Sequence, residues 1–182
     1  MRPWIPALIV LVACKGVTEP PPEGNDEEVI TTVELTIDNG TPFVWEDLEL
    51  DGNPTVDPVT VSIGSHAVSV RFLNGLEDPP EDITEEVEIE ATQHQVFWEV
   101  PAGFTWTTGD QDANGLPLGL TGTLEAPDVA SGDLTVTLRH MPEEGGEPVK
   151  VAGLAEVAAT DGIDALPGDT DVRVTFAISV EE

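Results

Sequence analysis

The stretch DVRVTFAISV at positions 171–180 alternates between large apolar side chains and side chains that are small or polar. Successive side chains of a β-strand point to opposite faces, so all the large apolar residues of this stretch fall on one face of an extended chain. An amphipathic helix would instead repeat its apolar residues every three or four positions. The period of two therefore predicts a β-strand with one face on a hydrophobic core, formed by Val172, Val174, Phe176, Ile178 and Val180.

The same period recurs earlier in the chain, at positions 29–38, 59–74, 94–100 and 132–140. Within the second of these segments, Gly64-Ser65 separates two alternating runs, which predicts a β-hairpin. Alternation of this kind is typical of antiparallel strands with one buried face. The residues predicted to face the core are Val29, Thr31, Val33, Leu35, Ile37, Val59, Val61, Ile63, Val68, Val70, Phe72, Val96, Trp98, Val100, Leu134, Val136 and Leu138, with Phe97 opposite and Arg139 outward.

Helical patterns are scarce, and proline and glycine interrupt much of the remaining chain. The segment 81–93 fits either a short acidic helix or an edge strand through Val87 and Ile89. The segment 152–160 fits one or two helical turns inside a long loop. We therefore predict that positions 29–182 form one all-β domain with little helix. Its expected architecture is a single antiparallel β-sandwich, Ig-like or transthyretin-like, of about seven to nine strands.

The N-terminus, MRPWIPALIVLVACKG, combines one positive charge, a short apolar run and a small residue before a cysteine. This pattern predicts a secretory signal peptide at positions 1–13, which is too short to span a bilayer. Leu11-Val12-Ala13-Cys14 resembles the lipobox of bacterial lipoproteins, which implies lipidation of Cys14 and cleavage before it. The alternative is an ordinary signal peptide followed by an incidental cysteine.

Cys14 is the only cysteine, so no disulfide within the chain can stabilise the domain. Positions 14–28 are rich in proline, glycine and acidic residues, and they predict a lipidated cysteine followed by an extended tether. Acyl chains on Cys14 would anchor the protein to a membrane of the bacterial cell envelope. Resemblance to the sorting rule of some Gram-negative lipoproteins favours the outer membrane, because Lys15 rather than an aspartate follows the cysteine. Whether the domain faces the periplasm or the cell surface is left open.

The chain carries 36 acidic and 6 basic residues, for a formal net charge of -30. This charge disfavours nucleic acid as a partner, because nucleic acid is itself negative. It suits either a solubilising surface or a cation-binding role. The sequence motifs of metalloproteases, serine hydrolases and phosphate-binding loops are missing from the chain. We therefore expect a protein that is not an enzyme.

The string DQDANG at positions 110–115 has two interpretations. Asp110, Asp112 and Asn114 have the spacing of the first oxygen ligands of a calcium loop, and a glycine follows them. The position that would carry the bidentate glutamate of such a loop holds Thr121. The Asn-Gly pair alternatively predicts a tight turn. We predict a turn first, and a turn can also present these side chains to a cation.

Two of the three histidines lie at the ends of predicted strands. His94 is in phase with Val96, and His140 is in phase with Leu138, so both should point to the apolar side at the rim of a sheet. Neutral imidazoles beside carboxylates can ligate a transition metal, whereas half-buried histidines bonded to the backbone are the alternative. The candidate ligands for Ca²⁺ or a transition metal ion are His94, His140, Asp110, Asp112 and Asn114.

Several strings of the sequence together resemble a family of uncharacterised bacterial lipoproteins. They are EEVITTVELTI, DPPEDITEEVEIEATQHQVFWEV, DQDANGLPLGL, GDLTVTLRHMP and GDTDVRVTFAISV. The family pattern has a DITEEI…HQFF block, a DxDANGxPIGL turn, an LxVxLxHxP strand and a TDIxVxF final strand, in the same order. The resemblance implies that both candidate histidines and the Asp-rich turn are motif positions, and it implies no activity. The chain departs from the family at 142–169, where the loop differs in composition and is longer.

Together these features predict a lipid-anchored binding or interaction module of the cell envelope. Its sharpest form is a cation- or ligand-binding accessory to an outer-membrane uptake system, with an envelope or outer-membrane protein as partner. The alternative is a purely structural or adhesion lipoprotein without a small-ligand site. The distances among His94, His140 and Asp110 distinguish these two hypotheses, because a shared binding site requires the three side chains to lie close together.

Overall fold

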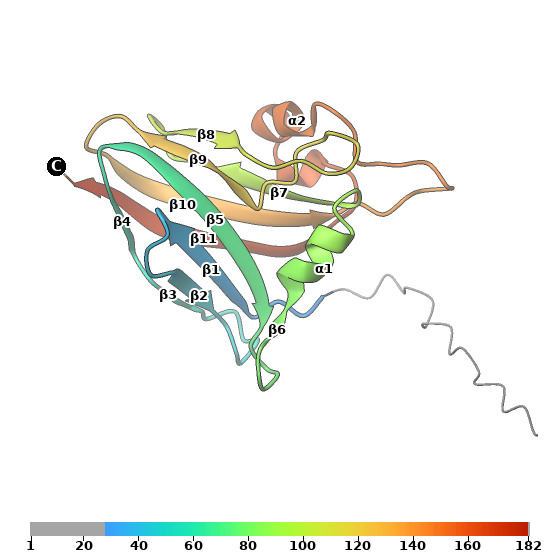
Figure 1. Cartoon of the computed structure of the whole chain (residues 1–182), viewed down its shortest axis with the longest axis horizontal. Helices are drawn as coiled ribbons and strands as arrows, with labels where there is room; N and C mark the ends of the chain where they lie inside the picture. Colours follow the sequence, from blue (N-terminus) through green and yellow to red (C-terminus); the bar gives the residue numbers. More distant parts are fainter. Residues whose placement is uncertain (1–27, 182) are drawn as a thin grey trace, which may run out of the picture.

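The computed structural model describes residues 28–181, so the predicted signal peptide, Cys14 and the tether up to residue 27 lie outside the described residues. The described chain forms two β-sheets packed face to face (Figure 1). The first sheet contains β1 (Thr32–Ile37), β2 (Phe43–Glu46), β3 (Thr55–Val56), β5 (Gly64–Asn74), β6 (Glu81–Asp82), β8 (Thr105–Thr108) and β9 (Thr121–Ala126). The second sheet contains β4 (Val59–Ser62), β7 (His94–Glu99), β10 (Ser131–His140) and β11 (Asp169–Glu181).

The strand order is β3-β2-β1-β5-β9-β8 in the first sheet, with β6 paired to β5, and β4-β11-β10-β7 in the second. This architecture confirms the prediction of an all-β sandwich. Nine strands have four residues or more, and β3 and β6 have two each. Among the described strands, only β4 and β11 pair in parallel. The predicted apolar stripe of β11 lies in the core between the sheets, where each of its five side chains is at most 8% exposed.

The predicted hairpin at Gly64-Ser65 is wrong, because β4 and β5 belong to different sheets. The chain crosses from the second sheet to the first at Ile63 and Gly64. Gly64 has a φ of 146°, a conformation that glycine adopts without steric cost. Ile63, which we predicted to face the core, is 46% exposed at this crossing. Alternation cannot distinguish a hairpin from a chain that changes sheets, since both arrangements keep the period of two.

The ambiguous acidic segment after β6 forms the helix α1 (Ile83–Ile89). Asp82 caps its N-terminus by accepting a hydrogen bond from the backbone amide of Thr84. Val87 is fully buried whereas Ile89 is 84% exposed, although a strand would place both on one face. Figure 1 shows α1 at the end of the sandwich where the described chain begins. Within residues 28–181, no helix is long and apolar enough to cross a membrane.

The long connection between β10 and β11 packs on the outer face of the second sheet. It contains the predicted helical turns, as α2 (Leu154–Asp161), and the short 3-10 helix η1 (Ile163–Ala165). These elements build a second, smaller core from Phe97, Met141, Leu154, Ile163 and Leu166. The face of β7 that we expected to lie opposite the main core is therefore covered by this loop.

Arg139 fastens this loop to β10. Its Nη2 donates to three consecutive carbonyl oxygens, from Leu166 to Gly168, at 2.8, 2.9 and 2.5 Å. Its Nη1 donates to the hydroxyl of Thr170 at 2.7 Å. Arg139 does point away from the main core, as predicted, but it is only 6% exposed because the loop covers it.

Candidate metal centre

His94 and His140 lie opposite each other on neighbouring strands. His94 is the first residue of β7 and His140 is the last of β10, and the two are partners in the strand register. Their rings stack with centroids 4.5 Å apart and planes inclined by 12°. His94 is fully buried and His140 is 8% exposed. The prediction that both histidines point inward at the rim of a sheet is confirmed.

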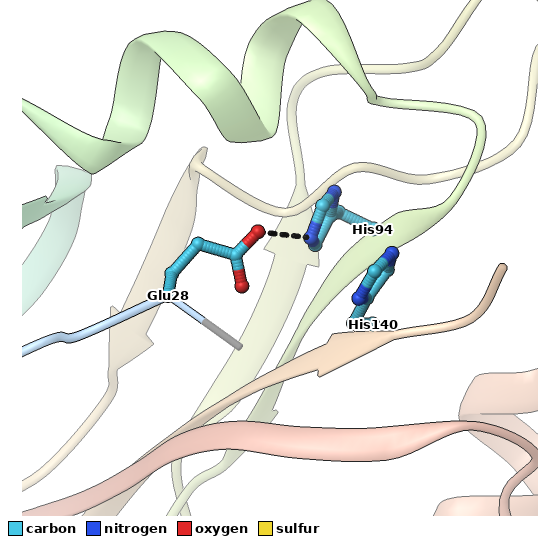
Figure 2. A group of neighbouring side chains, drawn as sticks. All are labelled: Glu28, His94 and His140. Carbon is cyan, nitrogen blue, oxygen red and sulfur yellow. Dashed lines mark ion pairs between the residues drawn. The ribbon is translucent and has the colours of Figure 1, made fainter. Parts of the chain in front are cut away.

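Glu28 brings a carboxylate to this pair (Figure 2). Its Oε1 lies 3.8 Å from His94 Nε2, and its side chain is only 7% exposed. One ligand atom from each of Glu28, His94 and His140 lies within 4.8 Å of the other two, close enough to hold a metal ion. Because Glu28 is the last residue that we assigned to the tether, the end of the tether segment lies against the sandwich.

Asp171 approaches His94 from the start of β11. Its Oδ2 lies 3.8 Å from His94 Nε2, and its side chain is 2% exposed. The register between β10 and β11 shifts just after Leu138, and Asp171 is the additional residue of the resulting β-bulge. A bulge re-aims a side chain out of the regular alternation. This bulge turns the carboxylate toward the histidines, although the adjacent Val172 faces the main core.

The C-terminal end of α1 adds two more carboxylates near the histidines. Glu90, its C-cap residue, accepts a hydrogen bond at its backbone oxygen from His94 Nδ1 at 3.3 Å, and its Oε2 lies 4.0 Å from the same nitrogen. Burial raises the pKa of Glu86, and the negative charges of Glu28 and Glu90 raise it further. Carboxylates therefore crowd this end of the sandwich, and such crowding favours a bound cation.

The protonation state of His94 leaves one of its ring nitrogens available as a metal ligand. Burial, followed by the charges of His140 and Lys150, lowers the pKa of His94 to about 4, so its ring is neutral at pH 7. Since Nδ1 carries the proton donated to Glu90, the lone pair lies on Nε2. Within residues 28–181, this nitrogen and Glu28 Oε2 are buried without a hydrogen-bond partner. A metal ion between them would satisfy both atoms.

The ligand atoms of the three side chains lie near one another, but they are farther apart than the ligands of a bound zinc ion would be. Zinc binds nitrogen and carboxylate oxygen at about 2.0–2.2 Å, which places neighbouring ligand atoms about 3.3 Å apart in a tetrahedron. The separations of up to 4.8 Å therefore have to shorten. An imidazole ligates through the lone pair in the plane of its ring, so two stacked rings cannot both point at one ion. Coordination requires one ring to turn, and the less buried His140 has more room to do so.

The turn predicted at positions 110–115 is present, but its carboxylates have other partners. The amide of Gly115 donates to the backbone oxygen of Asp112 at 3.0 Å, and this glycine has a φ of 76°. Asp110 accepts hydrogen bonds from two backbone amides, and Asp112 accepts from two others. In the part of the chain that the structure describes, the metal-ligand group contains neither Asp110 nor Asp112, and the backbone amide of Asn114 donates to Asp112. The structure thus unites the two predicted histidines and leaves the predicted turn outside their ligand group.

The cation that this turn binds is the ammonium group of Lys150. From the loop after β10, its Nζ lies 2.8 Å from Asp112 Oδ2 and donates to the carbonyl oxygen of Ala91 at 2.8 Å. The side chains of Lys150 and Asp112 are both fully buried. Burial lowers the pKa of Lys150 despite the opposing hydrogen bond to Asp112. Burial alone would raise the pKa of Asp112, but the hydrogen bond from Lys150 helps to hold it below its ordinary value.

The third histidine, His66 on β5, lies in a separate polar cluster. Its Nδ1 is 2.7 Å from Asp38 Oδ2, and its Nε2 is 2.9 Å from the backbone oxygen of Ser62. A carboxylate and a carbonyl only accept hydrogen bonds, so both contacts are satisfied only by the doubly protonated imidazolium. Although burial opposes it, the hydrogen bonds to Asp38 and Ser62 raise the pKa of His66.

This His66–Asp38 pair should make the protein less stable as the pH rises above about 6.5. A histidine whose pKa is raised on folding contributes stability that is complete below its unfolded pKa of about 6.5 and disappears as the pH passes its folded pKa. We expect an effect below about 1 kcal/mol, because solvent screens the half-exposed Asp38. Urea denaturation of the wild type and the His66→Gln variant at pH 6 and pH 8.5 measures this contribution to the free energy of unfolding. The stability difference between the two proteins should shrink at pH 8.5, and a constant difference would contradict the prediction.

Three pockets of the described chain exceed 400 Å³, and one of them, of about 460 Å³, is lined by Ala91, Thr92 and the Asp110–Asp112 turn. A pocket of about 600 Å³ is lined by His66, Asp38 and their neighbours. Another of about 410 Å³ is lined by Trp98 and Trp106, whose rings stack with centroids 4.1 Å apart. Glu28, His94 and His140 line none of these three pockets. An ion held by these three side chains would therefore be enclosed by protein and would not face the organic ligands that such pockets admit.

The carboxylates around the two histidines were not among the predicted metal ligands. A usable signal was the spacing of Glu86 and Glu90, since residues four apart lie on the same face of a helix. Strand alternation did not place Asp171, because a bulge breaks the pattern from which orientation is predicted, although the TDIxVxF motif of the resembling family includes this residue. The composition around Glu28 is that of a tether and did not mark it as a ligand, although the string EEVITTVELTI that resembles the family includes it.

Comparisons with protein-family models, with curated proteins and with solved structures gave no match. The residues of the chain and their geometry therefore carry any functional assignment.

Proposed function

We propose that the protein is a metal-binding module of the bacterial cell envelope, with one divalent transition-metal ion held by Glu28, His94 and His140. The observation that supports this proposal is a group of two buried imidazoles and one carboxylate whose side chain is 7% exposed. Two atoms of this group, His94 Nε2 and Glu28 Oε2, lack hydrogen-bond partners within residues 28–181. Leaving such atoms buried without a partner is costly, and one ion satisfies both. Asp171 is close enough to His94 to approach as a further oxygen ligand.

The donor set favours a transition metal over calcium. Calcium takes about six to eight oxygen ligands, whereas imidazole nitrogen suits zinc, copper and iron. Zinc also accepts mixed nitrogen and oxygen ligands with four-coordinate geometry. The carboxylates of Glu86 and Glu90 add negative charge near the site, which attracts a dication from solution.

Full-length protein purified without a polyhistidine tag should bind Zn²⁺ or Cu²⁺ at one ion per chain and should bind Ca²⁺ far more weakly. Elemental analysis of the protein as isolated and isothermal titration calorimetry with each chloride salt measure this. Absence of bound metal, together with no heat and no thermal shift on adding Zn²⁺ or Cu²⁺, would contradict the proposal. That outcome would favour a structural or adhesion role, in which the stacked histidines only pack the rim of the sandwich.

We also propose that Cys14 carries a lipid anchor and that the domain acts at the outer membrane, as an accessory to an uptake system or another envelope protein. The sequence Leu11-Val12-Ala13-Cys14 and the absence of any other cysteine support this. The wild-type protein should fractionate with membranes, and its N-terminal peptide should carry the mass of the acyl chains. The Cys14→Ser variant should lose both properties. A membrane-free wild type with an unmodified Cys14 would contradict the anchor.

A further inference from the structure

We propose that the bound metal ion acts as a latch that fastens the N-terminal end of the domain to the sandwich through Glu28. The inference rests on the proposed metal site and adds a regulatory consequence to it. Ion binding would fix the point at which the tether leaves the folded domain, and ion loss would release it. Figure 2 shows the arrangement behind this idea: Glu28 comes from the segment before β1, whereas both histidines come from the second sheet.

Among the first described residues, Ile30 and Thr31 are held by the domain itself, whereas Val29 and Glu28 are not held in this way. Ile30 is buried in the main core, and the amide of Thr31 donates to the backbone oxygen of Leu73 at 3.0 Å. Before them, Val29 is 45% exposed. The side chain of Glu28 is nevertheless only 7% exposed, and its Oε1 lies 3.8 Å from His94 Nε2, which is too long for a hydrogen bond. Its Oε2 also lacks a hydrogen-bond partner within residues 28–181.

The charges around Glu28 make its docking depend on a cation. The carboxylates of Glu90 and Asp171 lie 4.0 and 3.8 Å from ring nitrogens of the same His94. Together with Glu28, these carboxylates surround one imidazole, and like charges this close repel one another. A dication reverses this interaction, because it attracts every carboxylate around it. The same side chain is therefore held with the ion and expelled without it.

Release of Glu28 would uncover the amides next to it. If the segment opens only after the ion has left, saturating zinc suppresses opening by the factor 1 + [L]/Kd, or about 100-fold at a hundred times the Kd. Hydrogen–deuterium exchange of peptides that cover residues 28–31 measures this in the full-length protein, with ZnCl₂ or with EDTA. We expect exchange in this segment to slow strongly with zinc, and exchange in the middle of β5 to change much less.

The Glu28→Gln variant separates the latch from metal binding itself. It keeps both histidines, so zinc should still bind, with an affinity lower by at least about tenfold. Zinc at saturation should no longer slow exchange at residues 28–31. Glu85→Gln on the exposed surface of α1 is the matched control and should behave as the wild type. Zinc binding without slower exchange in the wild type, or equal slowing in Glu28→Gln, would overturn the latch and leave the metal site standing. Absence of zinc binding in calorimetry would overturn both.

Discussion

The Lys150→Met variant should unfold with a free energy about 3–5 kcal/mol below that of the wild type. Methionine retains a similar length but removes the ammonium that lies 2.8 Å from the buried carboxylate of Asp112. The carbonyl oxygen of Ala91 loses its donor in the same step. Leaving a buried charge without a partner costs far more than an added apolar contact can offset. Urea denaturation at pH 7, followed by tryptophan fluorescence, measures the difference.

The double variant Asp112→Asn/Lys150→Met should recover most of this loss. Asparagine keeps an oxygen that accepts the two backbone amides of the turn, and it removes the charge. Replacing a whole buried ion pair with neutral groups is often close to neutral for stability. Arg173→Met is the matched control, because its ion pair with Glu99 is about half exposed and should contribute less than about 1 kcal/mol. A Lys150→Met protein no less stable than this control would contradict the prediction.

The strands were predictable because burial of one face forces a period of two on the sequence. The stripes of β10 and β11 are buried as predicted, and both form the centre of the second sheet. The choice of partner strand was not predictable in the same way. The crossing at Gly64 keeps the alternation on both sides, so nothing in the pattern shows that β4 leaves its neighbour for β11. Pairing depends on contacts between residues far apart in the chain.

In the candidate site, too, the orientation of side chains on a strand was predictable, but contacts between distant parts of the chain were not. Strand phase correctly placed His94 and His140 on the inner side at strand ends, but their stacking depends on the register between β7 and β10. The calcium-like spacing at Asp110 and Asp112 was ambiguous, since short acidic side chains serve equally well to bind backbone amides in a turn. The partner of Asp112, Lys150, comes from the loop where the chain departs from the resembling family. A local motif could not identify that partner.

Replacing either candidate histidine should abolish tight zinc binding. Mutation of groups that only support a metal ligand typically costs 10- to 100-fold in affinity, so loss of a ligand in His94→Gln or His140→Gln should cost more than about 100-fold. In the wild type, zinc at a hundred times its Kd should raise the free energy of unfolding by about 2.7 kcal/mol. Neither variant should gain this stabilisation at the same zinc concentration. Calorimetry gives the affinities, and urea denaturation with zinc or EDTA gives the stabilities.

The third histidine provides the matched control for this experiment. His66→Gln removes an imidazole of the same kind from the Asp38 cluster, where both ring nitrogens already have hydrogen-bond partners. Its zinc affinity and zinc-dependent stabilisation should equal those of the wild type. Because His94 is fully buried, near-ultraviolet circular dichroism has to show first that each variant keeps native packing. If folded His94→Gln or His140→Gln bound zinc as tightly as His66→Gln, the ion would lie elsewhere, and the stacked pair would be a packing feature of the rim.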